Sequence, residues 1–117
     1  MNVGERDNSI LKHIIEYCDQ INVTVDRFGN DFETFDNDVV YRNAVSLCIL
    51  QIGELVGVLS DEFKEAHDTI PWSQIKKMRN IVAHRYGTVD TTITWDVIHE
   101  DIPELKNYCM GIYKESD

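Results

Sequence analysis

The fold is decided by the stretch VSLCILQIGELVGVL, which occupies residues 45–59. Its apolar side chains cover most of the circumference of a helix instead of one side, which is typical of a helix that is buried on most sides. Asn37 and Asp38, upstream, are both good helix N-caps. We therefore predict a long helix from one of these two residues to about Ala66, and we expect it to be the central element of the fold.

Two glycines and one acid interrupt this apolar helix. Gly53 and Gly57 are four residues apart on one side, where the missing side chains would let another helix approach closely. Each glycine costs about 1 kcal/mol against alanine in a helix. Glu54 lies between them, and an acid on so apolar a helix needs a partner or water. Two interpretations of Glu54 stay open, namely a surface carboxylate and a group that orients a site residue such as Arg79.

The segments before the central helix predict helical structure as well. From Asn8 to about Phe28, apolar residues recur at steps of three or four, which is the spacing of one helical face. Gly29 and the two polar residues after it then end this helix. The short acidic segment from Phe32 to Asp38 indicates one or two helical turns.

Two further helices are predicted after the central one. Pro71 suits the first turn of a third helix, because its missing N–H does no harm there. The stripe expected to pack into the core from this helix consists of Trp72, Ile75, Met78 and Val82. Asp90 can cap a last helix, in which Pro103 predicts a kink or a break near Asp101. The apolar residues expected on that helix are Ile93, Val97, Ile102, Leu105, Cys109 and Ile112.

Composition supports an all-α fold. The chain has 117 residues with only 6 Gly and 2 Pro, and no segment has the alternating pattern of a strand. This length suits one domain with one core. We predict a single helical domain over residues 1–117, folded as an antiparallel up-and-down bundle of four to five helices.

Charge and cysteine content limit the ligands and the cellular environment that we expect for this protein. With 11 basic and 21 acidic residues the net charge is −10, so indiscriminate binding of polyanions is not expected. Cys18, Cys48 and Cys109 have no metal-binding spacing, and we expect each to be a small buried hydrophobe. The polar N-terminus does not resemble a signal peptide, and the uncharged stretch 43–53 is well short of a membrane span. These features predict a reduced, soluble, cytoplasmic protein without membrane contact.

The segment RNIVAHRY, residues 79–86, contains the candidate catalytic residues. It brings a fixed cation, an amide, an imidazole and a phenol within eight residues, which can hold a phosphodiester and move a proton near neutral pH. The surrounding residues 76–85 contain no acid, which indicates a local positive site on an acidic body. The basic residues that we predict to contact RNA are Lys76, Lys77 and Arg85.

Helical geometry separates two members of this segment. At roughly 100° per residue, Asn80 and His84 share one face of the third helix, while Arg79 and Tyr86 share another. Arg79 and His84 are then about 140° apart, so one regular helix cannot easily aim both at one phosphate. Either the helix loosens near His84, which Gly87 permits, or two protomers pool their residues in a groove between them. The second solution predicts a homodimer.

These motifs resemble a known family. The pattern Arg-X4-His-X-Tyr is formed by Arg79, His84 and Tyr86, with flanking motifs in order on both sides. The flanking motifs are Ile70-Pro71-Trp72, Val89-Asp90, Trp95 and Asp101-Ile102-Pro103-Glu104-Leu105, and upstream Ile52-Gly53-Glu54 and Leu59-Ser60-Asp61-Glu62-Phe63. Over roughly residues 5–115 the chain resembles the HepT-like toxins of the HEPN superfamily.

The resemblance implies an all-helical homodimer that acts as a metal-independent endoribonuclease without a cofactor. It also implies a toxin encoded beside an MntA-like minimal nucleotidyltransferase, its antitoxin, in a type VII toxin–antitoxin system. By the motif, Arg79 and His84 carry RNA cleavage, and Asn80 supports them. Tyr86 matches the position that accepts AMP when the nucleotidyltransferase silences the toxin.

The chemistry expected from these residues is attack of a 2′-hydroxyl on the adjacent phosphorus. His84 would transfer the proton, and Arg79 would stabilise the charge on the phosphate oxygens. The absence of a carboxylate cluster in the sequence argues against a two-metal nuclease. The alternative function is a noncatalytic helical dimer that binds or presents a substrate to a nucleotidyltransferase, which the charge of −10 favours. A metal sensor built from His and Cys has little support.

Overall fold

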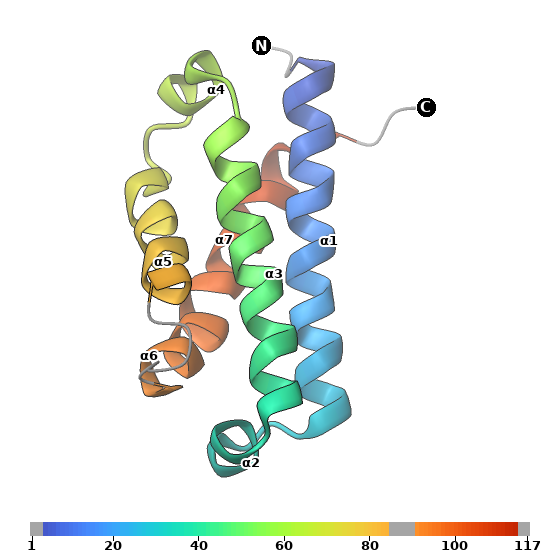
Figure 1. The fold of residues 1–117 in the computed structure, drawn as a ribbon. Helices are drawn as coiled ribbons and strands as arrows, with labels where there is room; N and C mark the ends of the chain where they lie inside the picture. Colours follow the sequence, from blue (N-terminus) through green and yellow to red (C-terminus); the bar gives the residue numbers. More distant parts are fainter. Residues whose placement is uncertain (1–3, 85–90, 115–117) are drawn as a thin grey trace.

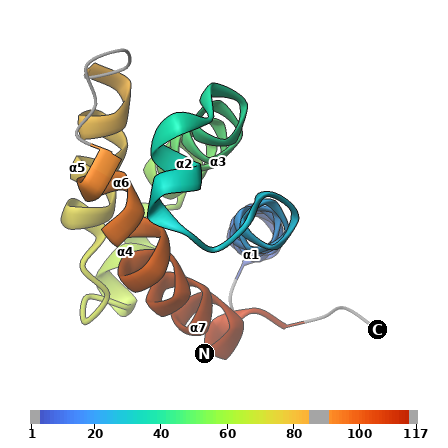
Figure 2. The same ribbon diagram turned by 90° about the horizontal axis from the view of Figure 1, so that it is seen from below.

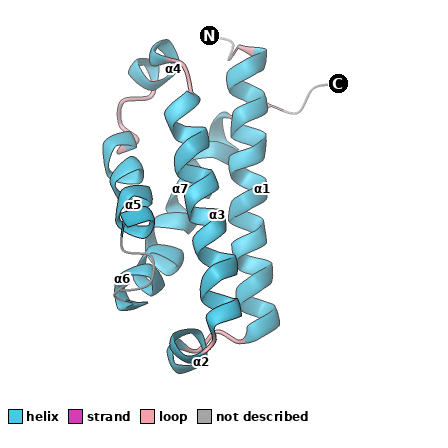
Figure 3. Cartoon of the chain, in the orientation of Figure 1, coloured by secondary structure: helices cyan, strands magenta, loops and turns pink. Residues whose placement is uncertain are grey.

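A computed structural model describes residues 4–84 and 91–114, and this part of the chain is helical and contains no strand (Figure 3). The elements, in chain order, are α1 (Glu5–Phe28), α2 (Phe32–Asn37), α3 (Val39–Val58), α4 (Asp61–Ala66), α5 (Trp72–His84), α6 (Thr91–Asp96), the π-helical turn η1 (Val97–Asp101) and α7 (Ile102–Ile112). The predicted all-α fold class is confirmed.

Four of these helices form an up-and-down bundle. The directions of α1, α3, α5 and α7 alternate along the chain, and the short helices α2 and α4 lie at the turns (Figure 1). The main packing contacts join α3 to α1 and to α5, and α1 to α7. Seen from below, α1 and α3 are nearly end-on, whereas α7 runs obliquely across the lower part of the picture (Figure 2). The predicted antiparallel bundle is therefore confirmed, and α3 is its central helix.

The first helix follows its predicted pattern closely. Ile10, Ile14 and Ile21 are buried in the common core, together with Leu11 and Cys18. The helix ends at a glycine with φ of 118°, a backbone conformation that other residues rarely adopt. The N–H of this Gly29 donates to the Val25 carbonyl at 2.8 Å, which closes the last turn.

The long central helix begins as predicted and ends earlier. The Asp38 side chain accepts hydrogen bonds from the backbone N–H groups of Val40 and Tyr41, so Asp38 is the N-cap of α3. The prediction that this helix continues to about Ala66 is wrong, because α3 ends at Val58 and α4 is a separate helix. The cause is Ser60, whose hydroxyl accepts from the Phe63 N–H at 3.1 Å and so starts a new helix.

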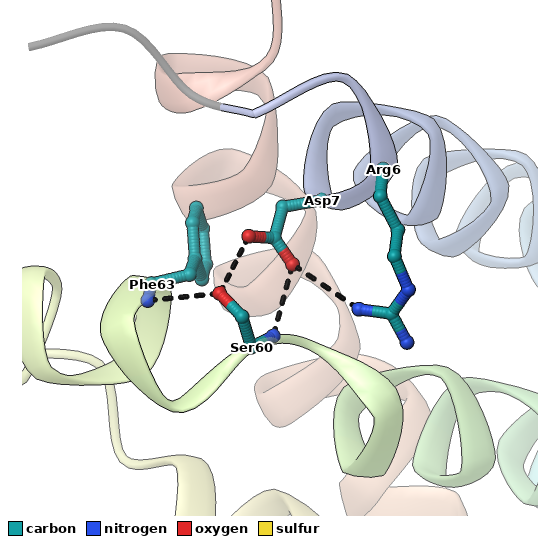
Figure 4. A network of polar contacts seen from close by, with 4 residues as sticks. All are labelled: Arg6, Asp7, Ser60 and Phe63. Carbon is teal, nitrogen blue, oxygen red and sulfur yellow. Dashed lines mark hydrogen bonds and ion pairs between the residues drawn. The ribbon is translucent and has the colours of Figure 1, made fainter.

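The break at Ser60 is also held by the start of α1. The carboxylate of Asp7 accepts the Ser60 N–H at 2.9 Å and the Ser60 hydroxyl at 2.6 Å (Figure 4). Arg6 lies 3.8 Å from the same carboxylate. Asp7 thus satisfies a backbone donor that a continuous helix would have bonded internally, and it ties the top of α1 to the α3–α4 corner.

The C-terminal helix contains the irregularity that Pro103 predicts. Proline has no N–H, and in an α-helix its ring meets the carbonyl four residues earlier. Here the chain widens into the π-turn η1, in which the Ile102 N–H bonds to the Val97 carbonyl. The side chain of His99 braces this turn, with Nδ1 2.8 Å from the Trp95 carbonyl and Nε2 2.7 Å from the Asn30 side chain.

One predicted apolar position of this helix faces outward. Ile93 is 38% exposed, while Thr94 beside it is 2% exposed. Val97 and Ile98 are both buried, so the centre of the buried face lies between them. At about 100° per residue that centre passes through position 94 and lies roughly 90° from position 93. Ile98, which is absent from the list of apolar residues expected on this helix, therefore belongs to its buried face, and Ile93 does not.

Helix α3 carries more apolar side chains than the core of the bundle buries. Among the described residues, α3 is the helix that is long and apolar enough to cross a membrane, a test that the core helix of a bundle also passes. One side of α3 packs on α1 and another on α5. A third side is exposed and carries Val40, Leu47 and Val58, which we call the outer stripe of α3.

Candidate functional site

Arg79 stands on α5 and reaches across to α3. Its Nη2 forms an ion pair and a hydrogen bond with Oε1 of Glu54. The Arg79 side chain is 33% exposed and that of Glu54 is 59% exposed, so the pair lies at the surface edge between the two helices. Of the two interpretations of Glu54, orientation of Arg79 is the one that this contact supports.

The contact depends on the glycine that precedes Glu54. A Cβ atom built on Gly53 would overlap the Cβ and Cγ atoms of Arg79 and would lie 3.3 Å from its Cδ. The aliphatic stem of Arg79 therefore lies directly on the backbone of α3. The predicted close approach of another helix is confirmed at Gly53 and is not found at Gly57, where a Cβ atom would meet no atom of the described residues within 4 Å.

The remaining motif residues are placed only by their backbone or not at all. Asn80 and His84 belong to α5, but their side chains lie outside the described part of the structure. Arg85 and Tyr86 lie outside the described residues altogether. Because α5 is α-helical from Trp72 through His84, it does not loosen before His84, and positions 79 and 84 keep their separation of about 140°.

Two lysines add positive charge to α5. Lys76 and Lys77 are both exposed. Position 76 is one turn before Arg79 on the same side of the helix, whereas position 77 precedes position 80 on the other side. The exposed cations of α5 are thus distributed around the helix, which suits contact with an extended polyanion more than a single bound ion.

A separate pocket lies between the start of α5 and α7. It is lined by Pro71, Gln74, Ile75, Asp101, Glu104, Leu105 and Tyr108. Burial raises the pKa of Asp101, and the nearby Glu104 and Asp96 carboxylates raise it further. Because two carboxylates line it, this pocket repels phosphate and is unsuited to RNA.

The cysteines take no part in the site. Cys18, Cys48 and Cys109 are free and buried, as predicted. Burial raises the pKa of both Cys18 and Cys109 to about 12, so neither forms the thiolate needed for nucleophilic or metal chemistry at neutral pH. Their role is packing.

Sequence reasoning found Glu54 and Arg79 and missed the role of Gly53 in joining them. The sequence predicted a close helix approach at Gly53 and, separately, a partner for Glu54. The available signal was their adjacency, because a glycine directly before an acid can admit the stem of the long cation that the acid pairs with. Which helix supplies that cation is decided only by packing.

Fold and site together define a small all-α bundle protein with an arginine-centred site at the edge of its central helix. The family model described as "Ribonuclease HepT-like" matches residues 11–112. The chain therefore belongs to the HepT-like ribonuclease family, as the motif predicted. No solved structure matches the chain.

Named relatives agree with this family. A protein of Caldanaerobacter subterraneus subsp. tengcongensis, named as a candidate RNase, is 38% identical over 105 residues, covering 90% of this chain and 92% of the relative. A protein of Thermococcus cleftensis named "Probable ribonuclease HepT" is 37% identical over 75 residues, covering 64% and 68%. A Methanocaldococcus jannaschii protein, named as a gamma-glutamylcyclotransferase and candidate RNase, is 38% identical over 110 residues, which are 92% of this chain and 47% of that relative. The chain thus spans about half the length of this relative.

Proposed function

We propose that this protein is the toxin of a toxin–antitoxin system and acts in the cytoplasm as a metal-independent endoribonuclease. One observation carries the proposal: in a member of a ribonuclease family, the motif arginine is held at the protein surface by a dedicated acid on the neighbouring helix. A guanidinium in such a position can bind the non-bridging oxygens of an RNA phosphate.

The proposed reaction is attack of a ribose 2′-hydroxyl on the adjacent phosphorus, which leaves a cyclic phosphate and a 5′-hydroxyl. Arg79 stabilises the charge that develops on the phosphate oxygens. His84 transfers the proton, since an imidazole titrates near neutral pH, and Asn80 supports the two. Lys76, Lys77 and Arg85 bind the flanking backbone of the RNA.

The active form in this proposal is a homodimer that meets through the outer stripe of α3. Charge supports this choice, since each copy carries −10 but the helix has no charged residue between Asn43 and Gly53. Around Leu47, two identical apolar faces can therefore approach without bringing like charges together, and Glu54 further along the same side is paired with Arg79. Glu54 and Arg79 border this face, and the regular geometry of α5 gives a reason for a second copy to complete the site.

The activity is tested by expressing the wild type, Arg79→Ala and His84→Ala without a partner and following growth and RNA integrity. We expect the wild type to stop growth and cut RNA into fragments with cyclic phosphate ends, and each variant to be at least about 100-fold slower. Purified wild type should cut equally well with a chelator present. A harmless wild type that leaves RNA intact would favour the noncatalytic dimer that presents substrate to a nucleotidyltransferase.

Mixing the two inactive variants tests whether the site is shared between subunits. If Arg79 of one protomer works with His84 of the other, a mixed dimer of Arg79→Ala and His84→Ala retains one intact site. Random mixing should then restore about a quarter of wild-type activity. If both residues act within one protomer, the mixture stays inactive although size-exclusion chromatography shows dimers.

Neutralisation is the regulatory part of the proposal. We propose that an MntA-like minimal nucleotidyltransferase transfers AMP from ATP to the hydroxyl of Tyr86, which loses its proton, and that pyrophosphate is released. The added negative charge and bulk, seven positions after Arg79 in the motif, would then block RNA. Incubation with the partner and ATP should raise the intact mass by one or more AMP units and stop RNA cleavage. A mass gain that persists in Tyr86→Phe rules out Tyr86 as the sole acceptor.

A further inference from the structure

The Gly53-Glu54 pair on α3 makes two separate contacts with one side chain of α5. Gly53 leaves room for the stem of Arg79 to lie on the helix backbone. Glu54 bonds to the terminal Nη2 atom of the same side chain. The two contacts act at opposite ends of Arg79, so Gly53 sets the direction of the stem and Glu54 favours one orientation of the guanidinium group.

An arginine that must bind a phosphate benefits from such a restraint. The side chain has many rotamers, and ordering it only when RNA arrives would reduce the binding energy available to the reaction. The guanidinium has five N–H donors, more than one carboxylate oxygen occupies, so a bond to Glu54 is compatible with phosphate binding. A restrained guanidinium group is already oriented when the phosphate binds.

We propose that Gly53 and Glu54 are positioning residues that set Arg79 in its phosphate-binding orientation. This inference rests on the ribonuclease activity proposed above. Neither residue touches the RNA, and Glu54 transfers no proton. Their effect is on the transition state, in which the orientation of Arg79 matters most.

Exposure argues against the opposite role, in which Glu54 would withhold Arg79 from RNA. The Glu54 side chain is 59% exposed, and ion pairs so open to water are weak. A weak pair orients a side chain that already lies on the helix but cannot compete with a polyanion for it. Gly53 is buried under the stem, so its contribution to orientation should exceed that of Glu54.

The test measures cleavage of a short RNA by the wild type, Glu54→Gln, Glu54→Ala and Gly53→Ala, with Gly57→Ala as the matched glycine control on the same helix. We expect kcat to fall about 10-fold in Glu54→Ala and up to about 100-fold in Gly53→Ala, while KM changes little. Glu54→Gln, which keeps an oxygen acceptor, should recover part of the loss. The pH profile should keep its shape in all variants, because His84 still transfers the proton.

A second measurement reports on Arg79 without any cleavage. Phenylglyoxal modifies accessible guanidinium groups, and peptide mass mapping assigns the modification to Arg79. We expect Arg79 to react several-fold faster in Glu54→Ala than in the wild type or Gly57→Ala. If the wild type cuts no RNA, the ribonuclease proposal fails, while this measurement still decides whether Glu54 restrains Arg79.

Three results would overturn the positioning role. The first is wild-type kcat in folded Glu54→Ala, and the second is unchanged reactivity of Arg79 in that variant. The third is loss of one limb of the pH profile in Glu54→Gln, which would make Glu54 a proton-transfer group instead. Glu54→Ala removes an exposed side chain and should fold, so the test does not depend on the stability of Gly53→Ala.

Discussion

Replacement of Gly53 by alanine is expected to lower the free energy of unfolding by about 2 kcal/mol. The new methyl group overlaps two carbons of Arg79 close to the α5 backbone, so a rotamer change at the far end of the side chain cannot relieve it. Overpacking of this kind costs about 3 kcal/mol, and the better helix propensity of alanine offsets about 1 kcal/mol. Urea unfolding followed by circular dichroism measures the difference.

Gly57→Ala is the control and should change stability in the opposite direction. It makes the same substitution one turn later in α3, where the methyl group meets nothing within 4 Å. Only the propensity term remains, so the variant should gain up to about 1 kcal/mol. If both alanine variants were stabilised, the close approach of Arg79 to the α3 backbone at Gly53 would be wrong.

Truncation of Tyr41 to alanine is expected to cost about 3–5 kcal/mol, the largest loss that we predict. Tyr41 is fully buried near the start of α3. Its ring stacks on Phe28 and meets Phe35 edge-on, each with a centroid separation of 5.0 Å. Alanine would leave a cavity where α1, α2 and α3 meet, and the surrounding helices cannot all close around it. The midpoint of thermal unfolding provides the measurement.

The Tyr41→Phe variant separates the contribution of the Tyr41 ring to stability from that of its hydroxyl. The hydroxyl donates to the Gly29 carbonyl at 3.0 Å and so fastens the loop that ends α1. Because phenylalanine keeps the ring packing and loses only this hydrogen bond, the expected cost is about 1 kcal/mol. Equal losses in Tyr41→Phe and Tyr41→Ala would mean that the hydroxyl, and not the ring, holds this corner together.

Much of the fold could be predicted because its signals are local. The cap at Asp38, the end of α1 at Gly29 and the irregular turn before Pro103 each depend on residues within a few positions. The missed break at Ser60 has a local signal too, since a serine three residues before Phe63 can cap a helix. The continuous apolar character on both sides of Ser60 outweighed that signal.

The candidate site was predictable in its residue types and only partly in its arrangement. The spacing of Arg79, His84 and Tyr86 pointed to the family, which the match over residues 11–112 confirms. The partner of Glu54 was one of two interpretations, because the sequence contains no measure of the distance between helices. The exposure of Ile93 has a related reason, since the buried face of a short helix depends on its neighbours.

The sequence by itself determined which segments are helical, where most of them begin and end, and to which family the chain belongs. These properties follow from periodicity, capping residues and a spaced motif, all of which act over a few residues. The tertiary structure decided that Gly53, and not Gly57, lies under another helix, and that Glu54 meets Arg79 across 25 positions. Contacts so distant in sequence depend on how the helices pack against one another, and short-range patterns do not specify that packing.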